Sequence, residues 1–199
     1  AFFPNLLPGA GQWIDTANTT TRQTQAQRSR KALEVRRVSE LDMCQALILP
    51  GGESTAIALL AKTYGLIEPL SKRISEGMPT YGSCAGMILL AERILDGVAG
   101  QETFGGIDMT VRRNAFGRQV DSFESELNFA GHQLRAVFIR APWVEELGSE
   151  VEVISSVKTP AGEMHPVAVR QKHLMATSFH PELTHDLAVH RYFFDEVCK

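Results

Sequence analysis

The sequence lacks the features of membrane proteins, disulfide-stabilised proteins and metalloproteins. No apolar run approaches the roughly 18 to 20 residues that a membrane-spanning helix needs. The 3 cysteines, Cys44, Cys84 and Cys198, fit neither a disulfide framework nor paired zinc ligands. No group of His, Cys, Asp and Glu has the spacing of metal ligands, so we expect no metal and no cofactor. Such sparse cysteine usage favours a reducing setting, and we expect the protein in the cytoplasm.

A strong excess of charge is also absent. The chain has 20 Lys and Arg residues against 23 Asp and Glu, which gives a formal net charge of −3. Neither a nucleic acid nor a membrane surface is therefore indicated as a partner. A length of 199 residues with 44% hydrophobic and 22% charged residues is typical of one soluble globular domain.

Residues 1–31 lack a sustained helical or strand pattern. Pro4 and Pro8 interrupt pairs of apolar residues, a tract rich in Thr, Gln and Arg follows, and Asp15 is the only acidic residue in the segment. We expect an atypical, poorly ordered N-terminal segment over 1–31, followed by a single domain over 32–199. The Arg-rich, acid-poor composition also fits an organelle transit peptide, which is the less favoured interpretation.

From residue 33 onward, short apolar runs alternate with segments of helical periodicity. This alternation predicts an α/β fold: a mostly parallel open sheet with helices on both faces and the ligand site at the carboxyl ends of the strands. The expected strands cover residues 33–38, 45–49, 78–81, 106–112, 121–126, 134–139, 151–157, 167–171 and 173–177, and the expected helices cover 54–64, 67–76, 84–95 and 183–197.

The most informative stretch is a tight turn around Cys84. A short strand pattern ends near Tyr81, the sequence Gly82-Ser-Cys-Ala-Gly86 follows, and an apolar helical segment begins. This is the pattern of a nucleophile elbow, with Cys in the place that other enzymes give to Ser. The two glycines allow the sharp turn, and the N-terminus of the helix favours a thiolate. The alternative is a buried structural cysteine beside a glycine turn.

A base for this nucleophile is indicated at His180. It follows an apolar strand pattern and precedes Pro181 and Glu182. If Pro181 holds the segment extended, the side chains two residues apart point to one side, so Glu182 can hold the imidazole. The other five histidines are assigned to polar helix faces, loops or hairpin ends: His132, His165, His173, His185 and His190.

The stretch Pro50-Gly-Gly-Glu-Ser54 ends another apolar strand pattern. In one interpretation this stretch is simply the start of a helix, because Ser54 and Thr55 are good N-cap residues. Alternatively, the backbone N–H groups of Gly51 and Gly52 can face a developing oxyanion.

Three motifs together resemble those of class I glutamine amidotransferases: Leu49-Pro-Gly-Gly-Glu-Ser-Thr55, Gly82-Ser-Cys-Ala-Gly-Met-Ile-Leu-Leu90 and His180-Pro-Glu182. The finer similarity is to the glutaminase subunits of pyridoxal 5′-phosphate synthases. It is carried by Gly105-Gly-Ile-Asp-Met-Thr-Val-Arg-Arg-Asn-Ala-Phe-Gly-Arg-Gln119, Asp121-Ser-Phe-Glu124 and Phe138-Ile-Arg-Ala-Pro142. The resemblance implies the flavodoxin-like three-layer fold of class I amidotransferases.

The resemblance also implies a mechanism. Cys84 would attack the side-chain amide of L-glutamine, His180 would transfer protons, and Glu182 would orient His180. Backbone N–H groups of Gly52 and Ala85 would hold the oxyanion, and ammonia would pass to the synthase subunit in a hetero-oligomer. The positions that match glutamine contacts in the family are Gly52, Glu53, Ser54, Arg113, Ile139 and Arg140. Exposed ion pairs are the alternative for both arginines.

The beginning of the chain departs from this family pattern. Members usually begin with an apolar strand that ends in Leu-Gln-Gly, and residues 1–31 contain no such sequence. A Pro-rich segment does not fit a central strand, so we expect reduced stability and reduced synthase-stimulated activity. A catalytically impaired regulatory partner, a glutaminase subunit of another amidotransferase and a cysteine peptidase are the alternative functions.

Overall fold

A computed structural model describes residues 31–115, 122–159 and 162–199 of the chain. The expectations for the N-terminal segment, its order and its targeting role, concern residues that lie outside these ranges, except for Lys31. In the part of the chain that the structure describes, no helix is long and apolar enough to cross a membrane.

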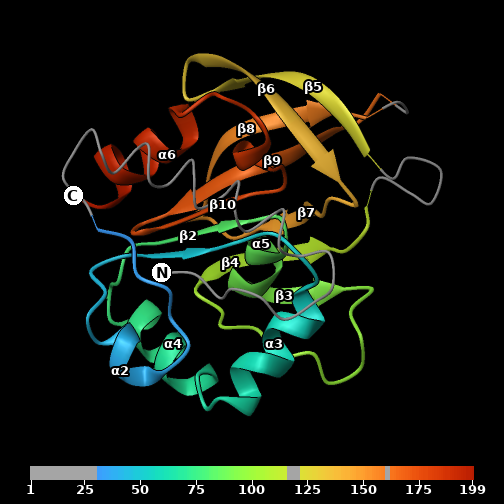
Figure 1. The fold of residues 1–199 in the computed structure, drawn as a ribbon. Helices are drawn as coiled ribbons and strands as arrows, with labels where there is room; N and C mark the ends of the chain where they lie inside the picture. Colours follow the sequence, from blue (N-terminus) through green and yellow to red (C-terminus); the bar gives the residue numbers. More distant parts are fainter. Residues whose placement is uncertain (1–30, 116–121, 160–161) are drawn as a thin grey trace.

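A five-stranded sheet forms the centre of the molecule (Figure 1). Its strands lie in the order β1 (Leu47–Leu49), β2 (Thr80–Ser83), β10 (Leu174–Thr177), β9 (Met164–Gln171) and β8 (Glu152–Lys158). The first three strands are parallel, whereas β9 and β8 are antiparallel to their neighbours. The α/β class is confirmed, and the sheet is mixed because hairpins supply its later strands.

Two smaller sheets flank the central one. β3 (Ala91–Leu95), β4 (Ile107–Arg112) and β7 (Trp143–Leu147) form a three-stranded sheet, in which β4 pairs with both neighbours. β5 (Ser122–Phe129) and β6 (His132–Ile139) form an antiparallel hairpin on the other side of the central sheet (Figure 1).

The helices are short and cover both faces of the central sheet. α2 to α4 lie on one side, together with α5, and α6 lies on the opposite side (Figure 1). Their bounds are α2 (Val38–Leu41), α3 (Ser54–Thr63), α4 (Ile67–Ser75), α5 (Ala85–Leu90) and α6 (Ala188–Tyr192), with a 3-10 turn at Pro181–Leu183 and a π-helical turn at Phe193–Val197.

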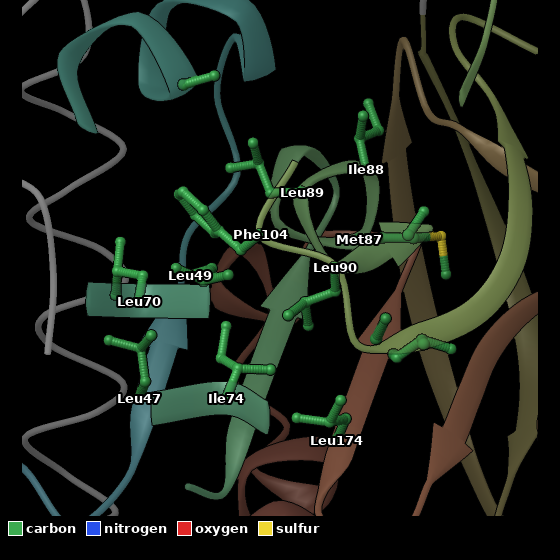
Figure 2. Close-up of a cluster of buried hydrophobic side chains, with 14 of the residues drawn as sticks. Leu47, Leu49, Leu70, Ile74, Met87, Ile88, Leu89, Leu90, Phe104 and Leu174 are labelled. Carbon is green, nitrogen blue, oxygen red and sulfur yellow. The ribbon is translucent and has the colours of Figure 1, made fainter. Parts of the chain in front are cut away.

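Two hydrophobic cores pack against the two faces of the sheet. Leu47 and Leu49 of β1 point into the core beneath α3 to α5, whereas Ile48 between them points into the core beneath α6. Leu174 and Met175 of β10 divide between the cores in the same way. This alternation follows from the two-residue period of a strand, and it explains why these strands are apolar throughout. Figure 2 shows the first core, with α5 packed on the sheet.

The helix predicted over residues 84–95 is wrong in its second half. α5 ends at Leu90, Ala91 is extended, and Ala91–Leu95 forms β3. β3 pairs in parallel with β4, and the Arg93 guanidinium donates to the Thr110 hydroxyl at 2.8 Å and to Asp108 at 2.7 Å. These partners across the sheet are distant in sequence, so tertiary pairing overrides a local helical pattern.

Two further element predictions are wrong in part. The strand expected over 33–38 is reduced to a bridge at Glu34, because the Glu40 carboxylate accepts the N–H groups of Arg36 and Arg37 and starts α2 at Val38. The helix expected over 183–197 begins only at Ala188, where the Asp186 carboxylate accepts the Ala188 N–H at 2.8 Å. Strand β7 was not anticipated.

Candidate active site

Cys84 lies at the turn between β2 and α5. Its backbone has φ +50° and ψ −102°, a conformation that L-residues rarely adopt. The Cys84 N–H donates to the Thr177 carbonyl at 2.7 Å, which holds the turn against β10. The residue is only 6% exposed. Cys84 thus lies at the N-terminus of a helix that contains no acidic residue in its first turn, a position that favours a reactive thiol.

Two glycines make the turn possible, as the sequence predicted. A Cβ on Gly82 would lie closer than 3.0 Å to the Gly86 carbonyl, and a Cβ on Gly86 would clash equally with the Leu49 carbonyl. Both obstacles are backbone atoms of buried elements. The close packing of α5 on β1 and β2 therefore requires glycine at both positions.

His180 and Glu182 form a buried pair beside this turn. His180 Nδ1 lies 2.7 Å from Glu182 Oε1, and the two side chains are 6% and 8% exposed. The His180 N–H donates to the Val137 carbonyl of β6 at 2.9 Å. The expected extended conformation at Pro181 is wrong, because Pro181–Leu183 forms a 3-10 turn that carries Glu182 back to the imidazole.

The surroundings of His180 favour its charged form. Burial alone would lower its pKa, but the adjacent Cys84 and the Glu182 carboxylate outweigh burial and raise the pKa to about 10. Because Nδ1 faces Glu182, Nε2 is the ring nitrogen that remains for Cys84. The arrangement brings together a cysteine, an imidazole and a carboxylate that orients the imidazole.

The glycine turn after β1 packs directly against this pair. A Cβ on Gly51 would meet His180 Nδ1 at 2.9 Å and the Cys84 Cβ at 3.5 Å. Gly52, the next residue, has φ +136°, a region that favours glycine. The Cys84 N–H already has an acceptor, whereas Ala85 is the first residue of α5 and its N–H has no acceptor within the helix. Gly52 and Ala85 thus stay the candidate oxyanion donors.

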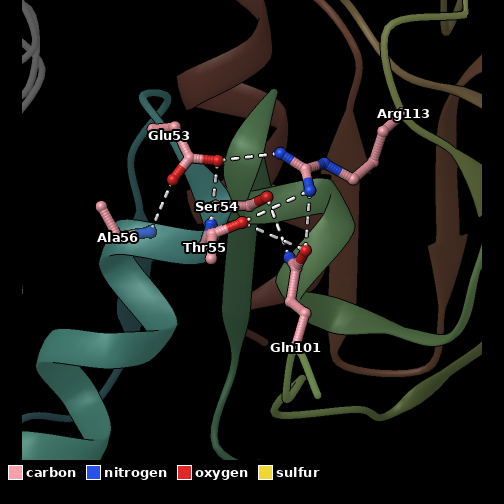
Figure 3. A network of polar contacts seen from close by, with 6 residues as sticks. All are labelled: Glu53, Ser54, Thr55, Ala56, Gln101 and Arg113. Carbon is pink, nitrogen blue, oxygen red and sulfur yellow. Dashed lines mark hydrogen bonds and ion pairs between the residues drawn. The ribbon is translucent and has the colours of Figure 1, made fainter. Parts of the chain in front are cut away.

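Glu53 and Arg113 form an ion pair at the N-terminus of α3 (Figure 3). Arg113 Nη2 lies 2.8 Å from Glu53 Oε1, although the two residues are 60 positions apart. The Glu53 carboxylate also accepts the N–H groups of Thr55 and Ala56 at 3.1 and 2.7 Å. Glu53 is therefore the N-cap of α3, a role that the sequence suggested for Ser54 or Thr55.

The remaining predicted substrate positions lie on two segments. Ser54 is 2% exposed, and its hydroxyl accepts the Gln101 amide at 3.0 Å. Ile139 ends β6, and its carbonyl lies 3.9 Å from Cys84 Sγ. Arg140 follows with φ +44° and an exposed side chain. The structure thus places Ile139 beside Cys84 and the Glu53–Arg113 pair at the start of α3.

Two residues near the site were not anticipated. Gln101 bonds to both Ser54 and Arg113 (Figure 3), and an isolated glutamine in a loop gives no sequence signal. His190 was assigned to a polar helix face, which is wrong: it is 3% exposed and lies edge-on to Tyr81 at a centroid distance of 6.1 Å. Burial lowers the pKa of His190 to about 4. Its apolar neighbour Val189 was the available hint that this part of the helix is buried.

Known proteins that are similar to this chain include glutamine amidotransferases, in agreement with the geometry of the site. The model of the SNO glutamine amidotransferase family matches residues 14–199. The chain is 59% identical over 169 residues to a pyridoxal 5′-phosphate synthase subunit PdxT from a Nocardioides species, covering 84% of each chain. It is 60% identical over 168 residues to the PdxT subunit of Mycolicibacterium vanbaalenii, covering 82% of this chain and 84% of the relative.

Solved structures agree on the fold. A crystal structure described as a glutamine amidotransferase superposes with a TM-score of 0.79 at 43% identity, covering 89% of this chain and 92% of the other. A Thermoplasma acidophilum protein described as one of the subunits of a GMP synthase has a TM-score of 0.58 at 16% identity, covering 94% and 87% of the two chains, which shows similarity of fold alone.

Proposed function

Because the chain belongs to the SNO glutamine amidotransferase family, we propose that Cys84, His180 and Glu182 are the triad with which it hydrolyses L-glutamine to L-glutamate and ammonia. The single observation that carries this assignment is the buried His180–Glu182 pair, at 2.7 Å, beside the Cys84 turn. A strained cysteine, a base and an orienting carboxylate are the three groups that thiol-dependent amide hydrolysis needs.

The reaction follows from this arrangement in two halves. His180 accepts the thiol proton of Cys84, and Cys84 Sγ attacks the side-chain carbonyl carbon of glutamine. The oxyanion accepts hydrogen bonds from the N–H groups of Gly52 and Ala85. When the C–N bond breaks, the imidazolium of His180 gives its proton to the departing ammonia, which leaves a glutamyl thioester on Cys84. His180 then takes a proton from water, whose oxygen attacks the thioester carbonyl carbon. The C–S bond breaks, glutamate is released, and Cys84 regains its proton from His180. Glu182 keeps the ring oriented throughout.

The remaining polar groups suit the α-carbon end of glutamine. An amino acid zwitterion needs donors for its carboxylate and acceptors for its ammonium. Arg113 and Arg140 supply cationic donors, whereas Glu53 and the Ile139 carbonyl supply acceptors. Gly52 and Ser54 complete the contact set at the start of α3. Gly52, Glu53 and Ser54 follow β1, Arg113 follows β4, and Ile139 and Arg140 lie at the end of β6. A ligand site of an α/β sheet is expected at the carboxyl ends of its strands.

The physiological partner is the synthase subunit of pyridoxal 5′-phosphate synthase, with which the chain forms a hetero-oligomer. The printed names of the curated relatives, subunits of that synthase, support this assignment. Ammonia released at Cys84 passes to the synthase subunit. Because Cys84, His180 and Glu182 supply the nucleophile, the base and its orienting group, the amidotransferase domain, residues 32–199, uses no cofactor for its own step. We assign the complex to the cytoplasm.

The test is glutamate and ammonia release from glutamine by the purified chain, with and without the synthase subunit. Cys84→Ala abolishes turnover, whereas Cys198→Ala, a cysteine outside the site, serves as the matched control and keeps it. A glutamine-like electrophile labels Cys84 in the wild type and in the control. Turnover that survives in Cys84→Ala would refute the triad, and absence of turnover in the wild type with its partner would favour a regulatory role.

A further inference from the structure

The side chain of Gln101 joins two segments of the proposed glutamine site (Figure 3). Its Nε2 donates to the Ser54 hydroxyl at 3.0 Å, and its Oε1 accepts from Arg113 Nη1 at 2.9 Å. The Thr55 hydroxyl lies 3.3 Å from the same oxygen. Gln101 is 46 to 47 positions from these α3 residues and 12 from Arg113, so only the folded chain brings these residues together.

We propose that Gln101 is a positioning residue for glutamine binding, which fixes the Arg113 guanidinium against the N-terminus of α3. This inference rests on the proposed function, since it assumes that Arg113 contacts the substrate. Gln101 itself acts through Arg113 and Ser54, because its side-chain hydrogen bonds run to these residues and to Thr55.

The guanidinium of Arg113 is held from two sides. Arg113 Nη2 donates to the Glu53 carboxylate, and Nη1 donates to the Gln101 carboxamide oxygen at 2.9 Å and to the Thr55 hydroxyl at 3.3 Å. These three contacts use at most three of the five N–H groups of an arginine. The other N–H groups keep a fixed direction for a carboxylate ligand, and the side chain is only 13% exposed. Without Gln101, the guanidinium would keep only Glu53 and the longer 3.3 Å contact with Thr55, and its orientation would be less restricted.

A neutral carboxamide suits this position better than other side chains. It accepts from Arg113 with its oxygen and donates to Ser54 with its nitrogen, and a carboxylate can do only the first. A second carboxylate beside Glu53 would also turn the Glu53–Arg113 pair into a net negative group. Such a group would repel the carboxylate of an amino acid substrate.

The loop that carries Gln101 is anchored on both sides. The Gln101 N–H donates to the Val98 carbonyl at 2.9 Å, and the Phe104 N–H donates to the Leu89 carbonyl of α5 at 2.7 Å. Phe104 is 5% exposed and belongs to the core beneath α3 to α5. The carboxamide is thus presented from a fixed backbone, as a positioning role requires.

The experiment compares Gln101→Met and Gln101→Glu with the wild type in the complex with the synthase subunit. Gln101→Met keeps the length of the side chain and removes its hydrogen bonds to Ser54, Thr55 and Arg113, and Gln101→Glu adds the charge. Glu102→Gln is the matched control, because Glu102 is the next residue and pairs with Lys62 of α3 at 2.5 Å, outside this network. Initial rates over a range of glutamine concentrations give kcat and KM, and thermal unfolding gives Tm.

We expect Gln101→Met to raise KM about tenfold, the loss typical of hydrogen bonds to a charged group, with kcat changed less than about threefold. Gln101→Glu raises KM further, and Glu102→Gln leaves KM unchanged. If the wild type turns over glutamine and KM is unchanged in both Gln101 variants, the inference about Gln101 is overturned, but the proposed function is not. A lower KM in the variants would also overturn it, because Gln101 would then compete with the substrate for Arg113. A fall in Tm without a change in KM would mean a purely structural role and also overturn it. Absence of wild-type turnover would overturn the proposed function as well.

Discussion

Replacing Gly51 by alanine tests whether the geometry of the proposed triad depends on the glycine turn after β1. The added Cβ would lie 2.9 Å from His180 Nδ1 and closer still to Cε1, and both distances are shorter than real Cβ contacts. The backbone of Gly51 does not have a positive φ, so alanine adds no backbone strain there. The His180 imidazole must therefore move, or the turn must retreat from it.

The size of the effect follows from the contacts of His180. Ordinary van der Waals contact begins near 3.4 Å, so the ring must shift by roughly 1 Å, and a misplacement of that size can cost about 100-fold in rate. The ring has little freedom to absorb the shift, because Nδ1 is held by Glu182 at 2.7 Å in a buried site. We expect kcat to fall about 100-fold, with a smaller change in KM.

The assay measures kcat and KM of Gly51→Ala for glutamine, together with its Tm. Gly86→Ala is the contrasting variant, since its Cβ would clash with the backbone carbonyl of Leu49 in the core. We expect Gly86→Ala to lose stability, and Gly51→Ala to keep a Tm within a few degrees of the wild type. A Gly51→Ala enzyme with wild-type kcat would refute the reasoning, because the triad would then tolerate displacement of its base.

Three further outcomes follow from the same structure. His180→Ala should lower kcat about 10²- to 10⁴-fold, because the base is removed, and Glu182→Gln should lower it less, because the base remains but is poorly held; equal losses measured for the two would contradict these roles. Arg140→Ala should mainly raise KM for glutamine, and an unchanged KM would remove Arg140 from the substrate contacts. Burial lowers the pKa of His190 to about 4 in the folded protein. Between pH 6.5 and 4 the imidazole of His190 is therefore protonated in the unfolded chain but neutral in the folded one. The free energy of unfolding falls with decreasing pH in this range by up to about 1.4 kcal/mol per pH unit. His190→Gln should flatten that part of a Tm-against-pH curve, and an equal slope in both proteins would show that His190 titrates normally.

Local patterns in the sequence were enough to predict the elements of the central sheet. The apolar run that contains Leu47–Leu49 predicted β1, and the spacing of apolar residues predicted α3 and α4 almost to their ends. These elements bury faces that are already encoded in their own periodicity. β3 and β7 were missed because their stability comes from pairing with β4, which a local pattern does not contain.

The sequence by itself also determined the glycine turn around Cys84. Gly82 and Gly86 flank Cys84 at fixed spacing, and the steric reason for both glycines lies within a few residues of the cysteine and at the adjacent end of β1. His180 and Glu182 were likewise recognisable as a pair, because they are two residues apart. The conformation predicted between them was wrong, because a 3-10 turn at Pro181 replaces the expected extended segment.

Only the tertiary structure decided how the site is supported. The contact of Gly51 with His180, the double role of Glu53 as helix cap and partner of Arg113, and the position of Gln101 all join segments that are far apart in the chain. Burial of His190, with the low pKa that results, likewise depends on packing against the sheet. Such features arise from distances and desolvation between distant segments, and a linear pattern of residue types does not carry them.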